Sequence, residues 1–261
     1  MARRYRLSIV LPAHNEEGNI AMAIQRARAA ASRLCTTYEI IVVDDGSTDS
    51  TGTIVRAIAA TDRKIRLISF DRNRGYGEAL RAGLREARLD LVFFTDADLQ
   101  FDLEELEAFL PWIDRVHVVA GFRIDRQDSR MRKLNANIWN LIVRALFYVP
   151  VRDIDCAFKM FRRQVLEAID LESVGAMVNT ELMVRIARGG YSVVELGVTH
   201  YPRMAGKARG AKFRVIFTAL RELRSMHKRL SSIAAGTAAR DLMPPEETTD
   251  EQLSPSHTTS G

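Results

Sequence analysis

The chain has 261 residues, 47% of them hydrophobic, which is enough for one globular α/β domain with a large core. Its net charge of +5 is unevenly placed, since residues 1–240 hold all 38 Lys and Arg residues but only 28 of the 33 acids, a balance of +10 that favours anionic partners. The sequence has no run of about 18 apolar residues that would span a membrane, no signal-peptide pattern, and two cysteines in no metal or redox spacing, so we expect a cytoplasmic protein.

Apolar runs alternate with helical patterns along the chain, and this order predicts a mostly parallel sheet flanked by helices in a single domain of residues 1–235. The predicted elements are, in chain order, a strand at 7–11, a helix from about 17 to 34, strands at 39–43 and 65–70, a helix to about 88, and strands at 89–95 and 116–120. In such sheets, ligands bind beyond the carboxyl ends of the strands. The segments predicted to lie there are 12–16, 44–49, 73–77 and 96–100.

Two aspartates follow directly after the apolar run at 89–95. Asp96 and Asp98 are spaced i, i+2, and on an extended chain such residues point the same way. Both carboxylates can therefore face one point just past the end of the strand. Mg²⁺ prefers oxygen ligands and is commonly held by one or two carboxylates plus substrate phosphates, so the pair predicts a cation site for a phosphate-bearing substrate.

Four segments at the predicted strand ends together resemble family 2 glycosyltransferases of the GT-A fold. They read LPAHNEE at 11–17, VVDDGSTD at 42–49, NRGYGEALRAGL at 73–84 and DADLQ at 96–100. Within that family the chain looks most like the dolichol-phosphate mannose synthase branch, whose members move a sugar from a nucleotide sugar onto a polyprenyl phosphate. Further matches are GFR at 121–123, DIDCAFK at 153–159 and YPRMAGK at 201–207.

The resemblance implies roles for individual residues. Those matching the nucleotide site are Pro12, Ala13, Asn15, Glu16, Asp44 and Asp45. Those matching the metal and diphosphate site, for Mg²⁺ or Mn²⁺, are Asp96, Asp98 and Gln100. The residues expected to neutralise the remaining phosphate charge are Arg123 and, more loosely, Arg130, Arg132, Arg203 and Lys207. The family inverts the anomeric centre, and the donor is expected to be a GDP- or UDP-linked hexose.

The nature of the acceptor decides whether a catalytic base is needed. A lipid phosphate is already ionised at neutral pH and attacks without a base, whereas a sugar hydroxyl needs a base within hydrogen-bond reach. Relatives with hydroxyl acceptors carry an acid near residues 179–181, so Glu181 and Asp155 are the candidates if a base exists. Transfer to a polyprenyl phosphate is the main prediction, and transfer to a hydroxyl acceptor is the alternative.

Two basic amphipathic segments, near 130–149 and 211–230, predict helices that could lie in a lipid head-group layer at the cytoplasmic face of a membrane. An ordinary core-facing helix remains the alternative for each. Residues 236–261 form an acidic tail that is poor in apolar residues, and we expect it to be disordered.

A non-catalytic protein that binds nucleotides or nucleic acid is a more distant alternative. The positive charge would suit nucleic acid, but the few aromatic residues are scattered, so no basic stripe carries stacking side chains. We therefore expect no nucleic-acid partner. The sequence leaves the oligomeric state open.

Overall fold

The computed structural model describes residues 5–124, 130–175 and 177–203 together with Leu223 and Met226, and for residues 130–137 it describes only the helical backbone. The strands are β1 (Tyr5–Ala13), β2 (Cys35–Asp44), β3 (Ile65–Ser69), β4 (Leu91–Thr95), β5 (Val118–Ile124), β6 (Phe158–Arg162) and β7 (Val193–Thr199). They form one seven-stranded sheet in the order β3-β2-β1-β4-β6-β5-β7. Every neighbouring pair is parallel except those of β6, which runs antiparallel to both β4 and β5.

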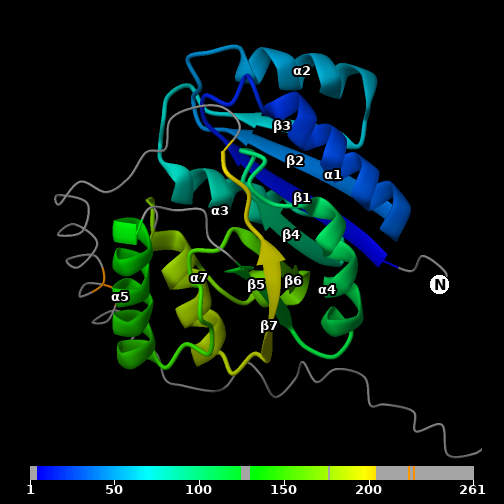
Figure 1. Ribbon diagram of the computed structural model, residues 1–261. Helices are drawn as coiled ribbons and strands as arrows, with labels where there is room; N and C mark the ends of the chain where they lie inside the picture. The colour runs from blue at the N-terminus through cyan, green and yellow to red at the C-terminus, as the bar shows by residue number, and fades with distance from the viewer. Residues whose placement is uncertain (1–4, 125–129, 176, 204–222, 224–225, 227–261) are drawn as a thin grey trace, which may run out of the picture.

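Helices cover both faces of this sheet, with α3, α5 and α7 on one side and α1 and α4 on the other (Figure 1). Their bounds are α1 (Ile20–Leu34), α2 (Thr51–Thr61), α3 (Tyr76–Glu86), η1 (Leu103–Glu105), α4 (Leu106–Ile113), α5 (Arg130–Phe147), α6 (Arg163–Glu167) and α7 (Met177–Arg188). The predicted α/β class with a mostly parallel sheet is confirmed. Among the described residues, none of these helices combines the length and apolar character needed to cross a bilayer.

The strands β1 and β2 lie inside the sheet, with a neighbouring strand on each side, and they have buried apolar side chains on both faces. The side chains of Ile9, Val10 and Leu11 in β1 are fully buried, as are those of residues 40–43 in β2. Continuous apolar runs of this kind are typical of parallel strands that are covered on both sides. In α1, buried residues recur three or four apart from Ile20 to Leu34, which is the pattern of a helix that packs one face on a sheet.

The sequence did not predict β6 and β7, and it placed some boundaries differently. The predicted strand at 116–120 begins at Val118 and continues to Ile124, and the predicted helix from 17 begins at Ile20. Of the predicted segment 211–230, only Leu223 and Met226 are described, and both are buried. The tail at 236–261 lies outside the described residues.

A loop at residues 172–175, which we call the 172–175 loop, packs against the start of α3. The backbone N–H of Glu78 donates to the carbonyl oxygen of Val174 at 3.2 Å. A Cβ atom added to Gly77 would lie 2.6 Å from the carbonyl oxygens of Ser173 and Gly175. Glycine at position 77 therefore allows the loop backbone to lie directly on α3.

Replacing Gly77 with alanine is expected to lower the free energy of unfolding by about 2 kcal/mol, because the new methyl group forces backbone atoms apart. Gly175→Ala is the matched control, since a Cβ at that position meets nothing within 4 Å. We expect this second variant to stay within about 0.5 kcal/mol of wild type. Urea denaturation of both variants measures the difference, and equal stabilities would contradict the close packing.

Candidate functional site

The carboxyl ends of β1, β2 and β4 meet at one edge of the sheet, and the predicted site residues follow them. Ala13 pairs with Asp44 across β1 and β2, and the Ala13 carbonyl oxygen accepts the N–H of Asp45 at 2.9 Å. Asp96 and Asp98 follow β4. This strand pairs with β1 on the side opposite to β2. Pro12 and Ala13 are themselves buried strand residues, so their side chains form the floor of this edge.

The loops after β1 and β2 are tied to one another. The backbone N–H of Asn15 donates to Ser47 Oγ at 2.9 Å, and Asn15 Oδ1 accepts the N–H of Thr48 at 2.8 Å. Asn15 adopts a positive φ of 56°, a conformation in which asparagine is enriched. This geometry brings the two predicted nucleotide-binding loops side by side.

The two acids at the end of β2 are buried and already hydrogen-bonded. Asp44 Oδ1 accepts the N–H of Ser47 at 3.0 Å. The carboxylate of Asp45 accepts the N–H groups of Arg74 and Gly75, at 2.6 and 3.0 Å. Asp45 therefore fixes the loop that leads into α3.

Asp96, which is half-buried, and Asp98, which is buried, form an acidic pair. Leu99 adopts a φ of 61°, which is rare for a bulky residue, and this turn lets the N–H of Gln100 donate to Asp98 Oδ1 at 3.2 Å. Burial and the charge of Asp98 raise the pKa of Asp96 to about 7, and burial raises the pKa of Asp98. Asp96 Oδ1 is buried and has no hydrogen-bond partner among the described residues.

These features suit a divalent cation, because a cation would favour the charged forms of both carboxylates and supply a partner for the orphaned oxygen. No group of three His, Cys, Asp or Glu side chains gathers as a metal site in the part of the chain that the structure describes. A pair of carboxylates leaves coordination positions for substrate phosphates and water, which is how Mg²⁺ is usually bound.

A strap at residues 200–203, just after β7, crosses beside this pair. The backbone groups of Tyr201 and Gln100 are joined by a 2.8 Å hydrogen bond, and Gln100 Nε2 donates to the Tyr201 carbonyl oxygen at 3.0 Å. The strap brings the guanidinium of Arg203 into an ion pair with Glu16 and to 3.7 Å from Asp98 Oδ2. Burial raises the pKa of Glu16, while Asn19 and Arg203 oppose that effect.

A cavity of about 700 Å³ is lined in part by residues 201–203 of the strap. Its lining includes Leu99 and Arg203 from the site, Arg26 from α1 and Asp102 beside η1. The volume falls within the usual range for small-molecule pockets.

Two cationic side chains, Arg123 and Lys159, act electrostatically on Asp96. Arg123 at the end of β5 makes a bidentate ion pair with Asp153, with both N···O distances 2.7 Å. Lys159 in β6 is fully buried, and its Nζ donates to the carbonyl oxygens of Ile154, at 3.0 Å, and Cys156. The charges of Arg123 and Lys159 both lower the pKa of Asp96, so the two cations lie near it.

Two residues predicted to take part in catalysis, Arg123 and Asp155, lie among charged partners of the chain itself. Arg123 is a phosphate-binding candidate whose donors Nε and Nη2 are directed at Asp153. Asp155 is half-buried, and its charge acts on Arg123 and Lys159. Lys207 and the side chains of Arg130 and Arg132 lie outside the described residues.

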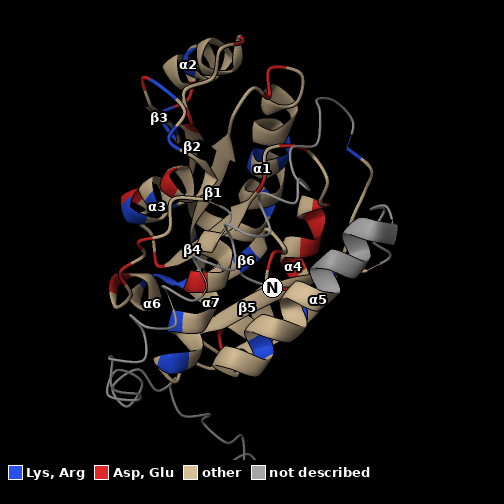
Figure 2. Cartoon of the chain, turned by 90° about the vertical axis from the view of Figure 1, so that its left-hand side faces the viewer, with Lys and Arg blue, Asp and Glu red and all other residues tan. Residues whose placement is uncertain are grey.

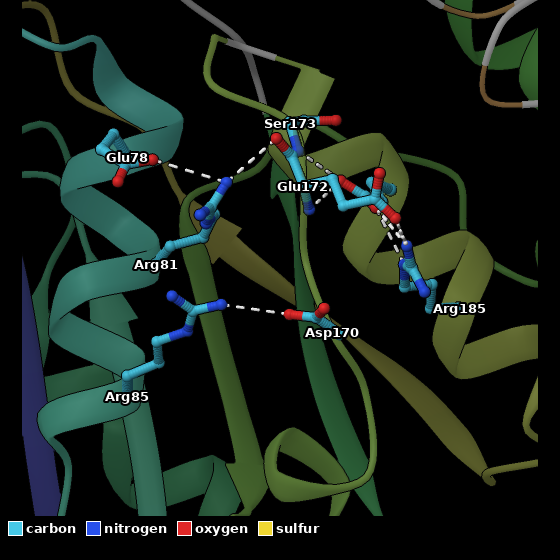
Figure 3. A network of polar contacts seen from close by, with 8 residues as sticks. Glu78, Arg81, Arg85, Asp170, Glu172, Ser173 and Arg185 are labelled. Atoms are coloured by element: carbon cyan, nitrogen blue, oxygen red, sulfur yellow. Dashed lines mark hydrogen bonds and ion pairs between the residues drawn. The ribbon is translucent and has the colours of Figure 1, made fainter.

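Glu181 occupies a closed polar network rather than an open cleft. Its Oε2 accepts the N–H groups of Glu172 and Ser173, at 3.0 and 2.7 Å, and its Oε1 accepts from Arg185 Nε at 2.8 Å. Burial opposes ionisation, but these donors outweigh it and lower the pKa of Glu181. Figure 3 shows the surrounding contacts, in which Arg81 reaches Glu78 and Arg185 reaches Glu172. This geometry argues against Glu181 as a base, because its oxygens are already used within the chain.

Sequence reasoning did not assign functional roles to Asp153, Lys159, Tyr76 or Asn179. A lysine within the apolar run at 158–161 was a usable signal, because lysine is almost never fully buried without a partner. The pairing of Asp153 with Arg123 joins residues 30 apart in sequence and left no local signal.

Residues 8–170 match the family described as Glycosyl transferase family 2. Two similar curated proteins are both named undecaprenyl-phosphate 4-deoxy-4-formamido-L-arabinose transferase. The one from Pseudomonas aeruginosa (strain LESB58) is 31% identical over 215 residues, which cover 80% of this chain and 62% of that protein. The one from Shewanella sediminis (strain HAW-EB3) is 30% identical over 240 residues, which cover 89% and 71%. The chain thus spans about three fifths of the Pseudomonas protein.

Solved structures share the fold. Glucosyl-3-phosphoglycerate synthase from Mycobacterium tuberculosis, in complex with Mn²⁺, UDP and phosphoglyceric acid, superposes with a TM-score of 0.63 at 24% identity, covering 87% of this chain and 78% of that one. Mannosyl-3-phosphoglycerate synthase from Rubrobacter xylanophilus gives 0.63 at 21% identity, covering 87% and 74%. At these identities the likeness concerns the fold, and it confirms the GT-A architecture.

Proposed function

Because the chain belongs to glycosyltransferase family 2, we propose that it transfers a hexose from a GDP- or UDP-linked donor to a polyprenyl phosphate, with inversion and with Mg²⁺ or Mn²⁺ as cofactor. The observation that carries the proposal is the pair of half-buried Asp96 and buried Asp98 at the end of β4, beside the loops that follow β1 and β2. The curated relatives are named as transferases to undecaprenyl phosphate, which supports this acceptor.

We assign the site residues to three roles: binding the donor, holding the cation and neutralising phosphate charge. We assign the base and ribose of the donor to the loops after β1 and β2, which carry Asn15, Glu16 and Asp44 and are joined to each other by hydrogen bonds. Asp96 and Asp98 would hold the cation, which when bound supplies a Lewis acid for the departing diphosphate. Arg203 lies next to Asp98 and forms an ion pair with Glu16. If its guanidinium exchanges Glu16 for a phosphate group of the donor, it can neutralise charge on that phosphate.

The closed network around Glu181 favours an acceptor that needs no base. A phosphate monoester attacks without losing a proton, while a hydroxyl acceptor requires a base of suitable pKa. With Glu181 held in its network, Asp155 is the remaining candidate from the sequence, and it lies among the charges of Arg123 and Lys159. The hydroxyl-acceptor alternative therefore depends on Asp155.

Contact with a membrane surface, proposed here to be its cytoplasmic face, is part of the same proposal, because a polyprenyl acceptor resides in lipid. Over residues 138–147, whose side chains are described, α5 has one charged residue, Arg144, and most of this stretch is drawn in the colour of uncharged residues in Figure 2. Apolar side chains on and just after this helix are exposed, with Leu141 at 68% and Tyr148 at 88% of their accessible surface, and Arg144 lies between them. An exposed apolar face beside a basic residue suits the head-group layer.

Calorimetry with GDP and UDP, each with and without Mn²⁺, tests the donor site. We expect one nucleotide to bind at least tenfold more tightly when Mn²⁺ is present, because the cation bridges its diphosphate and the Asp96–Asp98 pair. The Asp98→Asn variant serves as the control and is expected to lose most of the dependence on Mn²⁺. If neither nucleotide binds under any condition, the proposed function is wrong.

A further inference from the structure

A turn at residues 153–156, which we call the 153–156 turn, lies at the same edge of the sheet as the acidic pair. The turn leads into β6, whose first residue, Phe158, lies opposite Thr95 at the end of β4. Because these two strands are antiparallel, the residues before Phe158 are level with residues 96–98, which follow Thr95. On its other side β6 pairs with β5 in the same antiparallel sense, so β5 also ends at this edge.

The 153–156 turn is bound from within the sheet by Lys159. This side chain is fully buried, and its Nζ donates to the carbonyl oxygens of Ile154, at 3.0 Å, and Cys156. From α5, Asn140 Oδ1 accepts the N–H of Ile154 at 3.3 Å. Lysine is almost never fully buried without partners, so its two bonds to the turn fix the backbone there.

The first residue of the turn, Asp153, binds Arg123 of β5 through both carboxylate oxygens. Its Oδ2 accepts the backbone N–H of Arg123 at 3.2 Å and the Nε–H at 2.7 Å, and its Oδ1 accepts from Nη2 at 2.7 Å. Both side chains are nearly buried, with 12% of Arg123 and 9% of Asp153 exposed. Three hydrogen bonds to one residue fix the rotation of the guanidinium as well as its position.

Asp153 uses one edge of the Arg123 guanidinium, the edge formed by Nε and Nη2. A guanidinium is planar and carries five N–H donors in a fixed fork. Its second edge, formed by Nη1 and the other proton of Nη2, has the spacing that suits two oxygen atoms of one phosphate group. A planar group that is held along one edge presents the other edge in a fixed direction.

Stability alone gives little reason for this ion pair. A buried pair is often no more stabilising than apolar side chains of similar volume. This pair lies at the edge of the sheet where ligands bind in folds of this class, level with Asp96 and Asp98. Its place and its unused edge both favour a role in binding an anion.

We propose that Asp153 is a positioning residue: it directs the second edge of Arg123 at a phosphate group of a substrate, while Lys159 holds the 153–156 turn in place. This inference rests on the proposed function, which supplies two sources of phosphate, the diphosphate of the donor and the phosphate of the lipid acceptor. Asp153 acts through Arg123 and does not itself contact the substrate.

The test is sugar transfer to a polyprenyl phosphate by the full chain, with rates divided by the folded fraction that circular dichroism gives at the assay temperature. We expect Asp153→Asn to lower kcat/KM by about 10- to 100-fold, because a small misplacement of a group that binds substrate has effects of this size. Asparagine keeps the size of the side chain, but it directs an NH₂ group at the guanidinium and releases its orientation.

Two measurements on Asp153→Asn identify the phosphate. A raised KM for the polyprenyl phosphate, with unchanged affinity for GDP and UDP in calorimetry, assigns the acceptor phosphate to Arg123. Weaker binding of the nucleotide assigns the donor diphosphate to it. Either result supports the positioning role.

A double variant separates positioning from a purely structural role. In an Arg123→Gln background, Asp153 has no guanidinium to direct, so adding Asp153→Asn should change kcat/KM by less than about twofold. A structural role predicts the same loss in both backgrounds, because the 153–156 turn would be disturbed either way. Equal losses in the two backgrounds would overturn the inference.

Glu195→Gln is the matched control, because Glu195 on β7 binds the residue just before Asp153 in the same manner. Its Oε1 accepts the backbone N–H of Arg152 at 2.7 Å, and its Oε2 accepts from Arg152 Nε at 3.3 Å. The side chain of Arg152 is, however, 61% exposed. We expect wild-type kinetics in this variant. A loss equal to that of Asp153→Asn would show that any such pair beside the turn affects transfer, and would overturn the inference.

The outcomes separate the two proposals. If wild type transfers sugar and Asp153→Asn does so equally well per folded molecule, the positioning role is wrong and the proposed function stands. If wild type neither binds a nucleotide nor transfers sugar, the proposed function is wrong and the inference falls with it. If Asp153→Asn does not fold, Asp153→Glu decides, because it keeps the charge and moves the carboxylate by one methylene group. Wild-type kinetics in Asp153→Glu would then overturn the inference.

Discussion

Replacing Asp98 with asparagine is expected to reduce sugar transfer by about a thousandfold while leaving the fold at least as stable as in wild type. A cation that stabilises a departing diphosphate is worth several kcal/mol, and each 1.36 kcal/mol corresponds to a factor of ten in rate. Asparagine keeps the size of the side chain but removes the charge that would hold the cation. The measurement is transfer of sugar to a polyprenyl phosphate at saturating donor, in wild type and variant.

The stability half of this prediction follows from the pKa shifts. Burial raises the pKa of Asp98, so its charged form is disfavoured in the metal-free folded protein, and asparagine removes that penalty. For Asp96 the folded pKa of about 7 lies above the unfolded value, so the metal-free protein loses stability as pH rises from about 4 to 7. Without the neighbouring charge, the Asp98→Asn variant should show a weaker loss over the same range.

Asp90→Asn is a suitable control, because Asp90 is exposed and pairs only loosely with Arg6 at 3.6 Å. We expect wild-type rates and wild-type stability in that variant. Wild-type transfer in Asp98→Asn would remove the central role of the acidic pair. A variant that loses both activity and stability would instead indicate that Asp98 serves the fold.

The sequence predicted the strands that carry the proposed donor site. Strands that are buried on both faces can be recognised in the sequence as continuous apolar runs. Ligands bind beyond the carboxyl ends of such strands, so the acids that directly follow a run, here Asp96 and Asp98, are candidate site residues. The direction of β6 was not accessible, because the same pattern of side chains serves a parallel and an antiparallel neighbour. The strap of residues 200–203 depends on a pairing between Phe101 and His200, which lie far apart in sequence.

The roles of individual acids were harder to predict than their positions. Asp45 falls in a segment that matches the family, and Glu181 lies near a position where relatives with hydroxyl acceptors carry an acid, yet both carboxylates accept backbone N–H groups. Whether an acid faces a cleft or a neighbouring loop depends on where the loop packs in three dimensions. For Glu181 the decisive partners are Glu172 and Ser173, which lie in the 172–175 loop.

Replacing Glu181 with glutamine is expected to lower the free energy of unfolding by about 3 kcal/mol, because it removes the buried charge on which three donors converge and leaves Arg185 with only the half-exposed Glu172 as an acidic partner. Glu181 is fully buried and pairs with Arg185, whose side chain is only 12% exposed. Glutamine can accept one of the hydrogen bonds but directs an NH₂ group at the N–H donors or at the guanidinium. Urea denaturation measures the loss.

The pH dependence of this loss has a defined sign. The pKa of Glu181 is lowered in the folded protein, because the Ser173, Glu172 and Arg185 donors outweigh burial. Its stabilisation is therefore present above the unfolded pKa and disappears as pH falls through the folded value. The difference in stability between wild type and Glu181→Gln should be constant near neutrality and should shrink below about pH 4.

Glu167→Gln is the matched control, since Glu167 also pairs with an arginine four residues away, Arg163, but on the surface, where its side chain is 54% exposed. Exposed pairs of this kind contribute well under about 1 kcal/mol, so this variant should stay near wild type. A base at position 181 makes the opposite prediction, a large loss of rate in a fully stable protein. That result would identify Glu181 as a catalytic base and favour a hydroxyl acceptor, because a phosphate acceptor is already ionised and needs no base.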